Sequence, residues 1–406
     1  MNFALVKTEN ATTEHALPLP ELPAWSDTGW DIDIADSLEA AEGPWRALLR
    51  QDCFGTAYQD FDLCALWFQY VGAPAGYQPV VVIGRDAAGS PAFVWPLVRK
   101  SVSGCQVASF FCGRHANSGT MLWRNDIAPH ITQPDLQRIL QRMADAGIDA
   151  LALHNQPMQV RGVANPLLLL PHRSAPDKSY SVSLDGTADE VIARRYNADT
   201  RRKLRRKERQ LAGLPGYRYE RVTTFDQAER CVSEFLRQKA ARLSARGIAN
   251  AFDEPGMDAF LRAACRKGLS EGRPLVEIHA LTSDAEILAI FAGIHDRTCF
   301  STMFNSYTLG AHARMSPGLT LLLKLVDDCT RRGFETLNLG VGAAEYKSSL
   351  CETVEQPFDS FIGLTARGHI FALTTQVMSA VKSTIKNNPR LWDLVSKGRA
   401  KLFARS

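Results

Sequence analysis

This sequence of 406 residues lacks long apolar runs and regularly spaced pairs of cysteines. No uncharged apolar stretch approaches the ~18 residues that cross a bilayer, and the start MNFALVKTENATTE lacks the basic and apolar regions of a secretory signal. The nine cysteines are odd in number and none has CxxC spacing. We therefore expect a cytoplasmic protein without a disulfide framework, a zinc site or another bound metal.

The charge of the chain is unevenly distributed. Composition is that of a soluble protein, with 45% hydrophobic and 22% charged residues, long enough for two cores. The net charge is +4, but residues 194–209 and residues 367–406 each carry +7, so the remainder carries −10. Two segments are thus suited to meeting phosphates or an anionic surface.

The segment from Ser316 to Gly333 carries the most definite local signal. Ser316-Pro317-Gly318 precedes the apolar run LTLLLKLVDDCTRR, and Gly333 separates that run from the strand-like ETLNLG. These residue types are typical of helix ends, so we predict a helix that Ser316 caps through its hydroxyl. The amino end of such a helix has unused backbone donors and attracts phosphate.

A similar unit occurs earlier in the chain. PDLQRILQRMADAGIDALALHN also runs helix, glycine, strand, and its Gly147 lies 186 positions before Gly333. This separation is the size of a small domain, which favours duplication; chance is the alternative, because the unit is common in α/β proteins. The alignment superposes two pairs of leucines: Leu151 on Leu337, and Leu153 on Leu339.

The pattern of the whole chain predicts an α/β protein with mixed sheets. We predict a flexible leader at residues 1–30, a first half at 31–176, a second half at 177–365 and a basic helical tail at 366–406. The second half begins with helical patterns. Three strand candidates follow: PLVEIHALT, EILAIFAGIHD and TCFSTMFNSYT. The helix after Ser316 and a further strand come next.

This order resembles the GNAT acyltransferase fold. From Phe54 to about Arg405, the chain resembles more closely the CelD-like (BioF2-like) acetyltransferases, which are associated with cellulose and exopolysaccharide production. In that family, as in the Fem-type aminoacyltransferases that the chain also resembles, two GNAT-like halves lie side by side. The resemblance therefore implies two GNAT-like domains in tandem. It rests on the stretches GRHANSGTMLW, NPLLLLP, TRRKLRRKERQLA, ARMSPGLTLLLKLVDDCTRRGFETLNLGVGAAEYKSSL and NNPRLWDL.

The resemblance also implies a site for the diphosphate of acetyl-CoA. GNAT enzymes hold it on backbone amides in a loop patterned Gln/Arg-x-x-Gly-x-Gly/Ala. This chain departs from the pattern, because the segment has one glycine and Pro317 removes a donor. The first-half counterpart HITQPDL has no glycine, so a single cofactor site is expected in the second half. The residues in the matching place are Arg314, Met315, Ser316 and Gly318.

Many GNAT enzymes protonate the leaving thiolate with a tyrosine on the helix after the fifth strand, and Tyr346 occupies that place. Lys347 is similar to a Fem-type lysine that grips a substrate phosphate or carboxylate. The alternatives are a tyrosine that only packs its ring and a solvated lysine. Asn305 and Tyr307, at the end of the third strand, are expected to line the cleft.

Spacing singles out no catalytic base. A carboxylate or imidazole near the cleft could relay the acceptor's proton through water, and the alternative for each is a structural role. The residues available on or beside strands are Glu277, His279, His295 and Asp296.

Two further segments are expected to bind substrate. The loop GRHANSGTML offers Arg114, His115 and Asn117 to sugar hydroxyls, or else forms a polar turn. The basic helix, with Arg201, suits the phosphates of a nucleotide-sugar or lipid-linked saccharide, or else presents a solvated face. It has no aromatic residue between positions 201 and 210, so we expect no sequence-specific binding to nucleic acid.

The tail carries an apolar stripe at helical spacing, followed by Trp392 among basic residues. Such a helix either lies on an anionic membrane or covers the protein's own core. The stripe consists of Ile370, Leu373, Val377, Val381 and Ile385.

These features predict an enzyme, an acyltransferase that uses acetyl-CoA to modify the nitrogen or oxygen of a saccharide or amino-sugar precursor in exopolysaccharide or cellulose biosynthesis. The chemistry needs an acceptor deprotonated, a thioester carbonyl polarised and a thiolate protonated. Two alternatives stay open: a Fem-like transferase that uses aminoacyl-tRNA, and a non-catalytic scaffold of a polysaccharide synthase.

Overall fold

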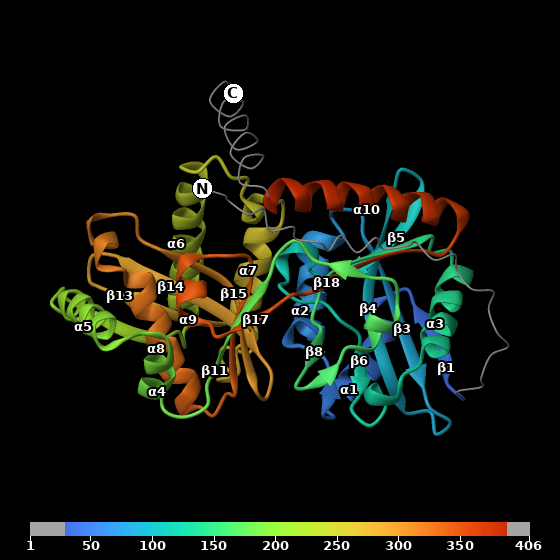
Figure 1. Ribbon diagram of the computed structural model, residues 1–406, viewed down its shortest axis with the longest axis horizontal. Coiled ribbons are helices and arrows are strands. Elements are labelled where there is room, and N and C mark those ends of the chain that lie inside the picture. The colour runs from blue at the N-terminus through green and yellow to red at the C-terminus, as the bar shows by residue number, and fades with distance from the viewer. Residues whose placement is uncertain (1–28, 388–406) are drawn as a thin grey trace, which may run out of the picture.

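The computed structural model describes residues 29–387, which form two units side by side (Figure 1). Each unit is built on a mixed sheet flanked by helices, as expected for the predicted α/β class. The predicted leader, apart from Gly29 and Trp30, and the last part of the tail lie outside the described residues. None of the helices between residues 29 and 387 combines the length and hydropathy that a bilayer crossing requires.

The first unit contains a nine-stranded sheet. Its order is β1 (Asp31–Ala35), β3 (Gln78–Arg85), β4 (Pro91–Val102), β5 (Cys105–Phe110), β7 (Ala150–Gln156), β18 (Phe358–Gly363) and β10 (Arg173–Ser174). Two short strands extend it from β4: β6 (Leu122–Arg124) and β2 (Cys53–Phe54). A separate hairpin joins β8 (Gln159–Val160) to β9 (Val163–Ala164). The helices of this unit are α1 (Leu38–Leu49), α2 (Phe61–Trp67), α3 (Gln133–Asp145) and α10 (Ala366–Asn387).

The second unit contains a seven-stranded sheet. Its order is β12 (Arg218–Arg221), β13 (Glu277–Thr282), β14 (Ile287–His295), β15 (Cys299–Tyr307), β16 (Thr336–Val341), β11 (Ser179–Ser183) and β17 (Thr353–Glu355). Its helices are α4 (Ala188–Arg195), α5 (Ala198–Ala212), α6 (Phe225–Ser244), α7 (Met257–Arg266), α8 (Pro317–Arg331) and α9 (Glu345–Leu350).

Both sheets join an antiparallel part to a parallel pair at the same place in the order. β5 pairs in parallel with β7, and β15 pairs in parallel with β16. The second pair is short, because only Cys299–Ser301 is hydrogen-bonded to Thr336–Asn338, while β15 continues to Tyr307. The last residues of β15 therefore have no partner in β16, and the two strands diverge there.

The predicted repeat occupies equivalent places in the two sheets. α3 and α8 each end two residues before a glycine in the left-handed region, Gly147 (φ +81°) and Gly333 (φ +78°). β7 and β16 then begin at the same interval from those glycines. The glycines are required because the chain must leave the helix with positive φ.

The two units exchange a strand with each other. β10 belongs to the first sheet, and the chain then enters the second sheet as β11, between β16 and β17. β17 leads in turn to β18, which lies between β7 and β10 of the first sheet. The predicted second half, 177–365, needs correction at its end, because β18 is hydrogen-bonded into the first sheet and α10 packs on that sheet as well.

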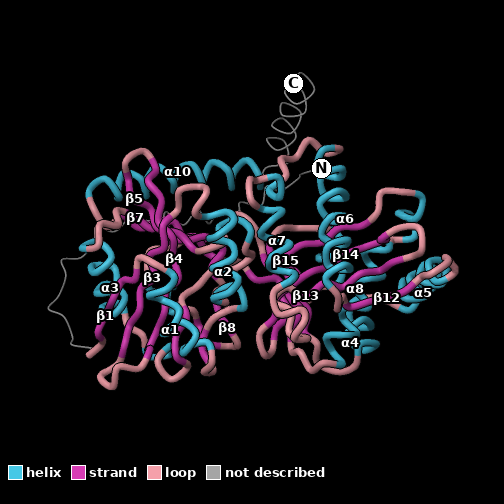
Figure 2. The backbone as a smooth tube through the Cα atoms, turned by 180° about the vertical axis from the view of Figure 1, so that it is seen from behind, coloured by secondary structure: helices cyan, strands magenta, loops and turns pink. Residues whose placement is uncertain are grey.

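One hydrophobic core spans the junction of the units. It combines buried residues of α1, α2 and β4 with buried residues of α6, α7, β13 and β14. Seen from behind, α2 lies beside α7 (Figure 2). Trp45 packs against Phe61 on the first side, and Phe235 against Phe304 on the second, with ring centroids 5.2 and 4.4 Å apart. Because burial of apolar surface stabilises folded proteins, this core holds the units together.

Candidate active site

The predicted acid, Tyr346 of α9, lies against the end of β15. Its hydroxyl oxygen accepts a hydrogen bond from Asn305 Nδ2 at 2.9 Å, and its ring meets Phe291 edge on. Burial raises the pKa of Tyr346, so the phenol stays protonated. Because Asn305 is the donor in this contact, the phenolic proton is available to a further acceptor.

The amino end of α8 lies beside the same strand. Gly318 packs on Tyr307, since a Cβ at position 318 would lie 3.0 Å from Tyr307 Cδ1. Tyr307 and Asn305 are two positions apart on β15 and share a face of the sheet. Asn305, Tyr307, Gly318 and Tyr346 therefore form one group, the Tyr346 site, which joins the predicted cofactor loop to the predicted acid.

Ser316 does not cap α8 through its hydroxyl, so that prediction is wrong. Its backbone is left-handed (φ +55°, ψ +52°), and its hydroxyl accepts a hydrogen bond from Lys207 Nζ of α5 at 2.8 Å. The left-handed backbone turns the side chain away from the helix amides. Such a conformation costs a non-glycine residue about 1–2 kcal/mol and is concentrated at functional sites.

Two backbone donors remain at the start of α8. Pro317 is the first helical residue, as predicted, and has no N–H. The amide of Thr320 donates to the carbonyl of Ser316 at 3.1 Å. The amides of Gly318 and Leu319 are thus the donors that the helix itself does not use.

The other residues of the predicted cofactor loop precede α8 in a short 3-10 turn, Ala311–Met315. The side chain of Arg314 is exposed, and Met315 packs partly buried against the core of the second unit. An exposed guanidinium near the amino end of a helix suits a diphosphate. The part of Arg314 and Met315 in cofactor binding stays a prediction.

Lys347 is buried rather than solvated. Its Nζ donates to the carbonyls of Gly340 and Val341 at 3.2 and 3.0 Å. Burial lowers the pKa of Lys347 to about 8, and the charge of Lys239 contributes in the same direction. A buried lysine with two carbonyl acceptors is held in place, while its predicted role toward substrate stays a prediction.

Two cationic residues of α6, absent from the sequence-based predictions, complete the Tyr346 site. Lys239 Nζ lies 3.5 Å from the carbonyl oxygen of Asn305, and burial lowers the pKa of Lys239 to about 8. The guanidinium of Arg242 lies over the ring of Tyr307, 4.3 Å from its centroid. Their spacing of three on a helix was visible in the sequence, but the packing of α6 against β15 was not.

Asn117, predicted to bind sugar, lies at the junction of the two units. Its Nδ2 donates to the carbonyl of Thr302 on β15 at 2.8 Å and to the hydroxyl of Tyr58 at 3.0 Å. Tyr58 in turn donates to the same carbonyl at 3.0 Å. This amide side chain therefore joins the first unit to the second.

Arg114 and His115 lie at the same junction. Both pair with Glu254 of the second unit, with His115 Nε2 3.1 Å from the carboxylate. His115 Nδ1 also accepts a hydrogen bond from Trp67 Nε1 at 3.2 Å, and burial lowers the pKa of His115 to about 4. Substrate binding by this loop stays a prediction, and the contacts of Arg114 and His115 described here are with protein.

The predicted base candidates do not reach the Tyr346 site. Glu277 begins β13, while His295 ends β14 and Asp296 follows it, and antiparallel pairing brings these two strand ends together. The Tyr346 site lies near the opposite ends of the strands, at the amino end of α8. This helix has 15 residues and is about 22 Å long. His279 lies further in and is fully buried.

His279 and Glu277 belong to a buried network. Burial would raise the pKa of Glu277, but hydrogen bonds from His279 at 2.7 Å and Arg332 at 2.5 Å lower it to about 2. Tyr219 bonds the other ring nitrogen of His279, at 2.8 Å. Ligand atoms of Glu277, His279 and Asp328 lie within 4.8 Å of one another, as in a metal site, but Arg332 already donates to both carboxylates. The network is therefore a neutralised ion-pair cluster.

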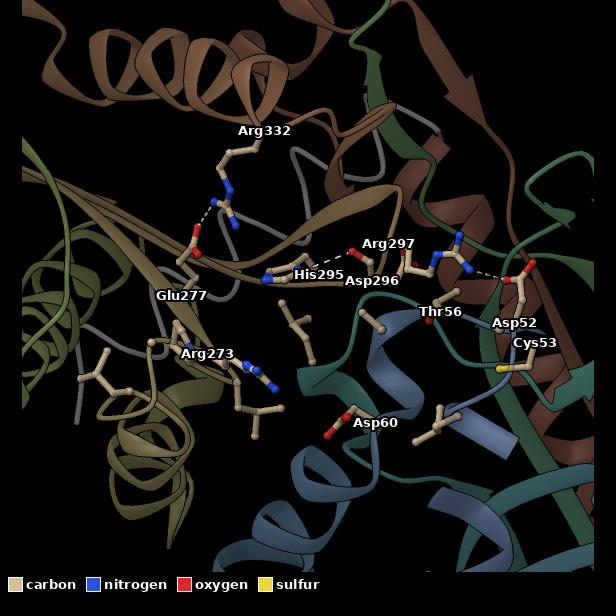
Figure 3. Close-up of a pocket in the computed structure, with 18 of the residues that line it drawn as sticks. Asp52, Cys53, Thr56, Asp60, Arg273, Glu277, His295, Asp296, Arg297 and Arg332 are labelled. Atoms are coloured by element: carbon tan, nitrogen blue, oxygen red, sulfur yellow. Dashed lines mark hydrogen bonds and ion pairs between the residues drawn. The ribbon is translucent and has the colours of Figure 1, made fainter. Parts of the chain in front are cut away.

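A cavity of about 750 Å³ lies between the units, beside Glu277 and His295 (Figure 3). Most of its charged side chains are paired: Arg332 with Glu277, and Arg161 with Asp52 at 3.2 Å. Arg273 also lines it. The cavity lies at the carboxyl end of α8, whereas the Tyr346 site lies at its amino end. We therefore do not include the cavity in the candidate active site.

Arg201 lines a smaller cavity, of about 490 Å³, between α4, α5 and α8. Its Nε is buried without a hydrogen-bond partner among the described residues. Thr320, in the first turn of α8, lines the same cavity, which therefore reaches the amino end of that helix. Lys324 and Glu208 form an ion pair of 2.5 Å in its wall. Binding of a phosphate by Arg201 stays a prediction.

Residues 198–348 match the family described as the acetyltransferase (GNAT) domain. This stretch runs from the start of α5 into α9 and contains the whole Tyr346 site. The match supports an acyltransferase. No curated protein sequence matches the chain significantly.

Solved structures share the fold at low sequence identity. FemX is 9% identical, with a TM-score of 0.56 over 82% of this chain and 97% of FemX. A conserved protein of unknown function from Bacteroides thetaiotaomicron VPI-5482 is 11% identical, with a TM-score of 0.51 over 82% of this chain and 100% of that one. A tandem GNAT protein from the clavulanic acid biosynthesis pathway is 12% identical, with a TM-score of 0.40 over 83% and 99%. The predicted fold, α/β with two GNAT-like units in tandem, is confirmed.

Proposed function

We propose that this protein is an acyltransferase that takes an acyl group, most simply acetyl, from acyl-CoA to an amino or hydroxyl group of a saccharide. The observation that carries the proposal is the Tyr346 site, where a half-buried phenol held by Asn305 lies beside the amino end of α8. The two parts come from separate predictions, one of an acid and one of a diphosphate site. Their convergence within the region matched by the GNAT family supports the reaction class.

The residues at the start of α8 fit a diphosphate. The amides of Gly318 and Leu319 are unused donors, and the exposed Arg314 supplies a positive charge. Lys207 of α5 reaches Ser316 at the same end, and Arg201 lines the cavity that includes Thr320 of the first turn. Side-chain cations thus make up for the donor that Pro317 lacks.

The roles of Tyr346 and Asn305 are argued from the direction of their hydrogen bond, and the role of Lys239 from its lowered pKa. When the acceptor attacks the thioester carbonyl carbon, the C–S bond breaks and Tyr346 donates its phenolic proton to the departing sulfur. Asn305 orients the phenol by donating to its oxygen. Lys239, partly neutral near its pKa of about 8, accepts the proton that the acceptor loses.

The acceptor class rests on the resemblance to CelD-like acetyltransferases. We propose an amino-sugar or saccharide precursor of an exopolysaccharide, modified in the cytoplasm. The phosphates of a nucleotide-sugar or lipid-linked form would suit the cations of α5, which has nine basic residues in and just before it.

A second candidate is a transferase that uses aminoacyl-tRNA. It is favoured by the likeness to FemX, which spans both units, and by the basic α5 beside the start of α8. Under this alternative the same Tyr346 site would serve an aminoacyl ester, and RNase treatment would abolish transfer. A scaffold without catalysis is the third candidate. Biological complementation retained by a chain carrying Tyr346→Phe and Lys347→Ala would favour it.

The decisive experiment incubates the purified chain with acetyl-CoA and a panel of amino sugars and nucleotide-sugars, and follows free CoA by thiol titration. We expect CoA release that depends on the acceptor and is insensitive to RNase. Absence of both acetyl-CoA binding and CoA release with every acceptor would contradict the proposal.

A further inference from the structure

α10 turns four large apolar side chains away from the protein, while Phe371 packs partly buried against the first sheet. Ile370, Leu373, Val377 and Met378 are 66%, 62%, 63% and 61% exposed. Their spacing puts them on one face of the helix, which we call the α10 stripe. Apolar side chains gathered on an exposed face indicate an interaction surface. Val381 and Ile385, also predicted for this stripe, have side chains outside the described residues.

The opposite face of α10 already holds the helix on the first sheet. Gly368 lies so close to the chain at Asp149 that a Cβ would contact its carbonyl oxygen, and Ala372 is buried. Gln376 Nε2 donates to the carbonyl of Phe361 on β18 at 3.1 Å. Gly368, Ala372 and Gln376, together with the partly buried Phe371, thus face the protein. Of the two predicted fates of the stripe, covering the protein's own core is wrong for the described residues.

The start of α10 is firmly anchored. The carboxylate of Asp149 accepts hydrogen bonds from Thr365 Oγ1 at 2.7 Å and Arg367 Nε at 2.9 Å. Arg367 also donates to the carbonyl of Gly104 in the β4–β5 turn, where Val102 is 41% exposed. The α10 stripe therefore lies on a fixed helix along an outer edge of the molecule (Figure 1).

The sequence around the stripe is basic. No acidic residue occurs between Asp359 and Asp393, and residues 367–406 contain eight basic residues and one acidic residue. Lys382 and Lys386 fall within α10 itself. Positive charge beside an apolar helical face is the combination that adsorbs to anionic bilayers.

We propose that the α10 stripe docks on the surface of a membrane that contains anionic lipids, with the helix lying in the plane of the interface. The stripe enters the boundary between headgroups and acyl chains, and the net positive charge of the sequence from 367 to 406 favours anionic headgroups. A second copy of the chain fits this face less well, because it would bring two segments of charge +7 together. If the proposed function holds, docking would place the Tyr346 site beside lipid-linked substrates.

The test uses the full-length protein and vesicles of phosphatidylcholine, with or without about 30 mol% phosphatidylglycerol. The variant replaces Ile370, Leu373 and Val377 together by glutamine, which keeps helix propensity. The matched control replaces three exposed apolar residues elsewhere, Met158, Leu169 and Ile248, by glutamine. Melting temperature confirms folding of both variants, and CoA release from acetyl-CoA confirms that the Tyr346 site is unaffected.

We expect the wild type and the control to float with the anionic vesicles, and the α10 variant to bind at least about ten-fold more weakly. Binding of the wild type should fall as salt is raised. Equal binding by the α10 variant, or no binding by the wild type, overturns the proposal. So does a wild-type dimer that the α10 variant converts to a monomer, because the stripe would then be covered by a second copy. Loss of CoA release in all proteins would instead count against the proposed function.

Discussion

The contact between Asn305 and Tyr346 defines the chemistry that the site can perform. A phenol that accepts from an amide keeps its own proton for donation, and burial, by raising the pKa of Tyr346, makes it an acid rather than a base at neutral pH. Lys239 shows the opposite effect, because burial lowers its pKa to about 8 and makes the neutral amine accessible. One environment thus yields a proton donor and a proton acceptor.

The first prediction concerns Tyr346→Phe. Removing the hydroxyl takes away the acid but keeps the ring beside Phe291, so we expect kcat for CoA release to fall by about 10²–10⁴ with little change in KM for acetyl-CoA. The control is Tyr196→Phe, which removes a hydroxyl that lies 3.0 Å from Ser349 Oγ outside the site. Equal effects of the two substitutions would mean that Tyr346 has only a packing role.

The second prediction concerns pH. If Lys239 is the base, kcat/KM should rise with pH through an apparent pKa near 8, because only the neutral amine accepts a proton. Lys239→Met should remove this rise. Lys347→Met, at a lysine of similar pKa, should keep it. A pH profile that is unchanged in Lys239→Met would exclude Lys239 as the base.

The same lysines make a prediction for stability. Their folded-state pKa of about 8 lies below the ordinary value of 10.5, so the unfolded chain binds more protons between these values. Their contribution to the free energy of unfolding is therefore fully present above about pH 10.5 and is lost as pH falls toward 8. Denaturant titrations should show that, as pH rises from about 8 to about 10.5, the free energy of unfolding of the wild type increases relative to that of the Lys239→Met, Lys347→Met double variant. A stability difference that is independent of pH would contradict the lowered folded-state pKa of Lys239 and Lys347.

At the scale of elements, α8 and β15 decide where a cofactor fits. β15 runs past the end of its pairing with β16, so Asn305 and Tyr307 project where the two strands diverge. α8 begins against Tyr307 with two unused amides and a left-handed residue before them. The start of α8 and the end of β15, which is paired with β14 but not with β16, thus lie together.

The fourth prediction concerns Gly318→Val at this contact. The added side chain would press on the ring of Tyr307 and displace it from the start of α8, so affinity for acetyl-CoA should fall at least about ten-fold by calorimetry. Gly43→Val is the control, because position 43 of α1 has open space around its Cβ. Binding that survives Gly318→Val would move the cofactor to another site.

At the scale of the whole molecule, strand exchange and a shared core make two GNAT-like units one folding unit. The chain passes from β10 of the first sheet to β11 of the second, and from β17 of the second sheet to β18 of the first, and the core at the junction draws on both units. The contact of Tyr58 and Asn117 with Thr302 adds hydrogen bonds across the same boundary. Unfolding one unit alone would expose the apolar surface of the other.

The fifth prediction is a single cooperative unfolding transition, with calorimetric and van't Hoff enthalpies in agreement. Asn117→Ala should lower the free energy of unfolding by about 1–3 kcal/mol, since it leaves the Thr302 carbonyl with one donor fewer. The transition should stay single. Asn250→Ala, whose amide bonds Asp253 within its own turn, should cost less. Two resolved transitions in the wild type would show that the units unfold independently.

Local sequence patterns predicted those features of the structure that depend on residues close together in the chain. The helix ends at Gly147 and Gly333 and the strands that follow them could be predicted, because each depends on a short stretch with a definite period or turn residue. The place of Tyr346 was implied by the resemblance to GNAT enzymes instead. The buried, unpaired state of most cysteines was also foreseeable from their apolar surroundings, although Cys53 and Cys299 are only partly buried.

The sequence by itself determined the class of fold, the duplicated helix-glycine-strand unit and the two basic segments, because composition and periodicity act over a few residues. Only the tertiary structure decided that Ser316 bonds Lys207 instead of its helix, that Lys239 lies beside Asn305, that β18 belongs to the first sheet and that the stripe of α10 faces outward. These outcomes join residues far apart in the chain, and their free energies depend on packing that no local pattern records.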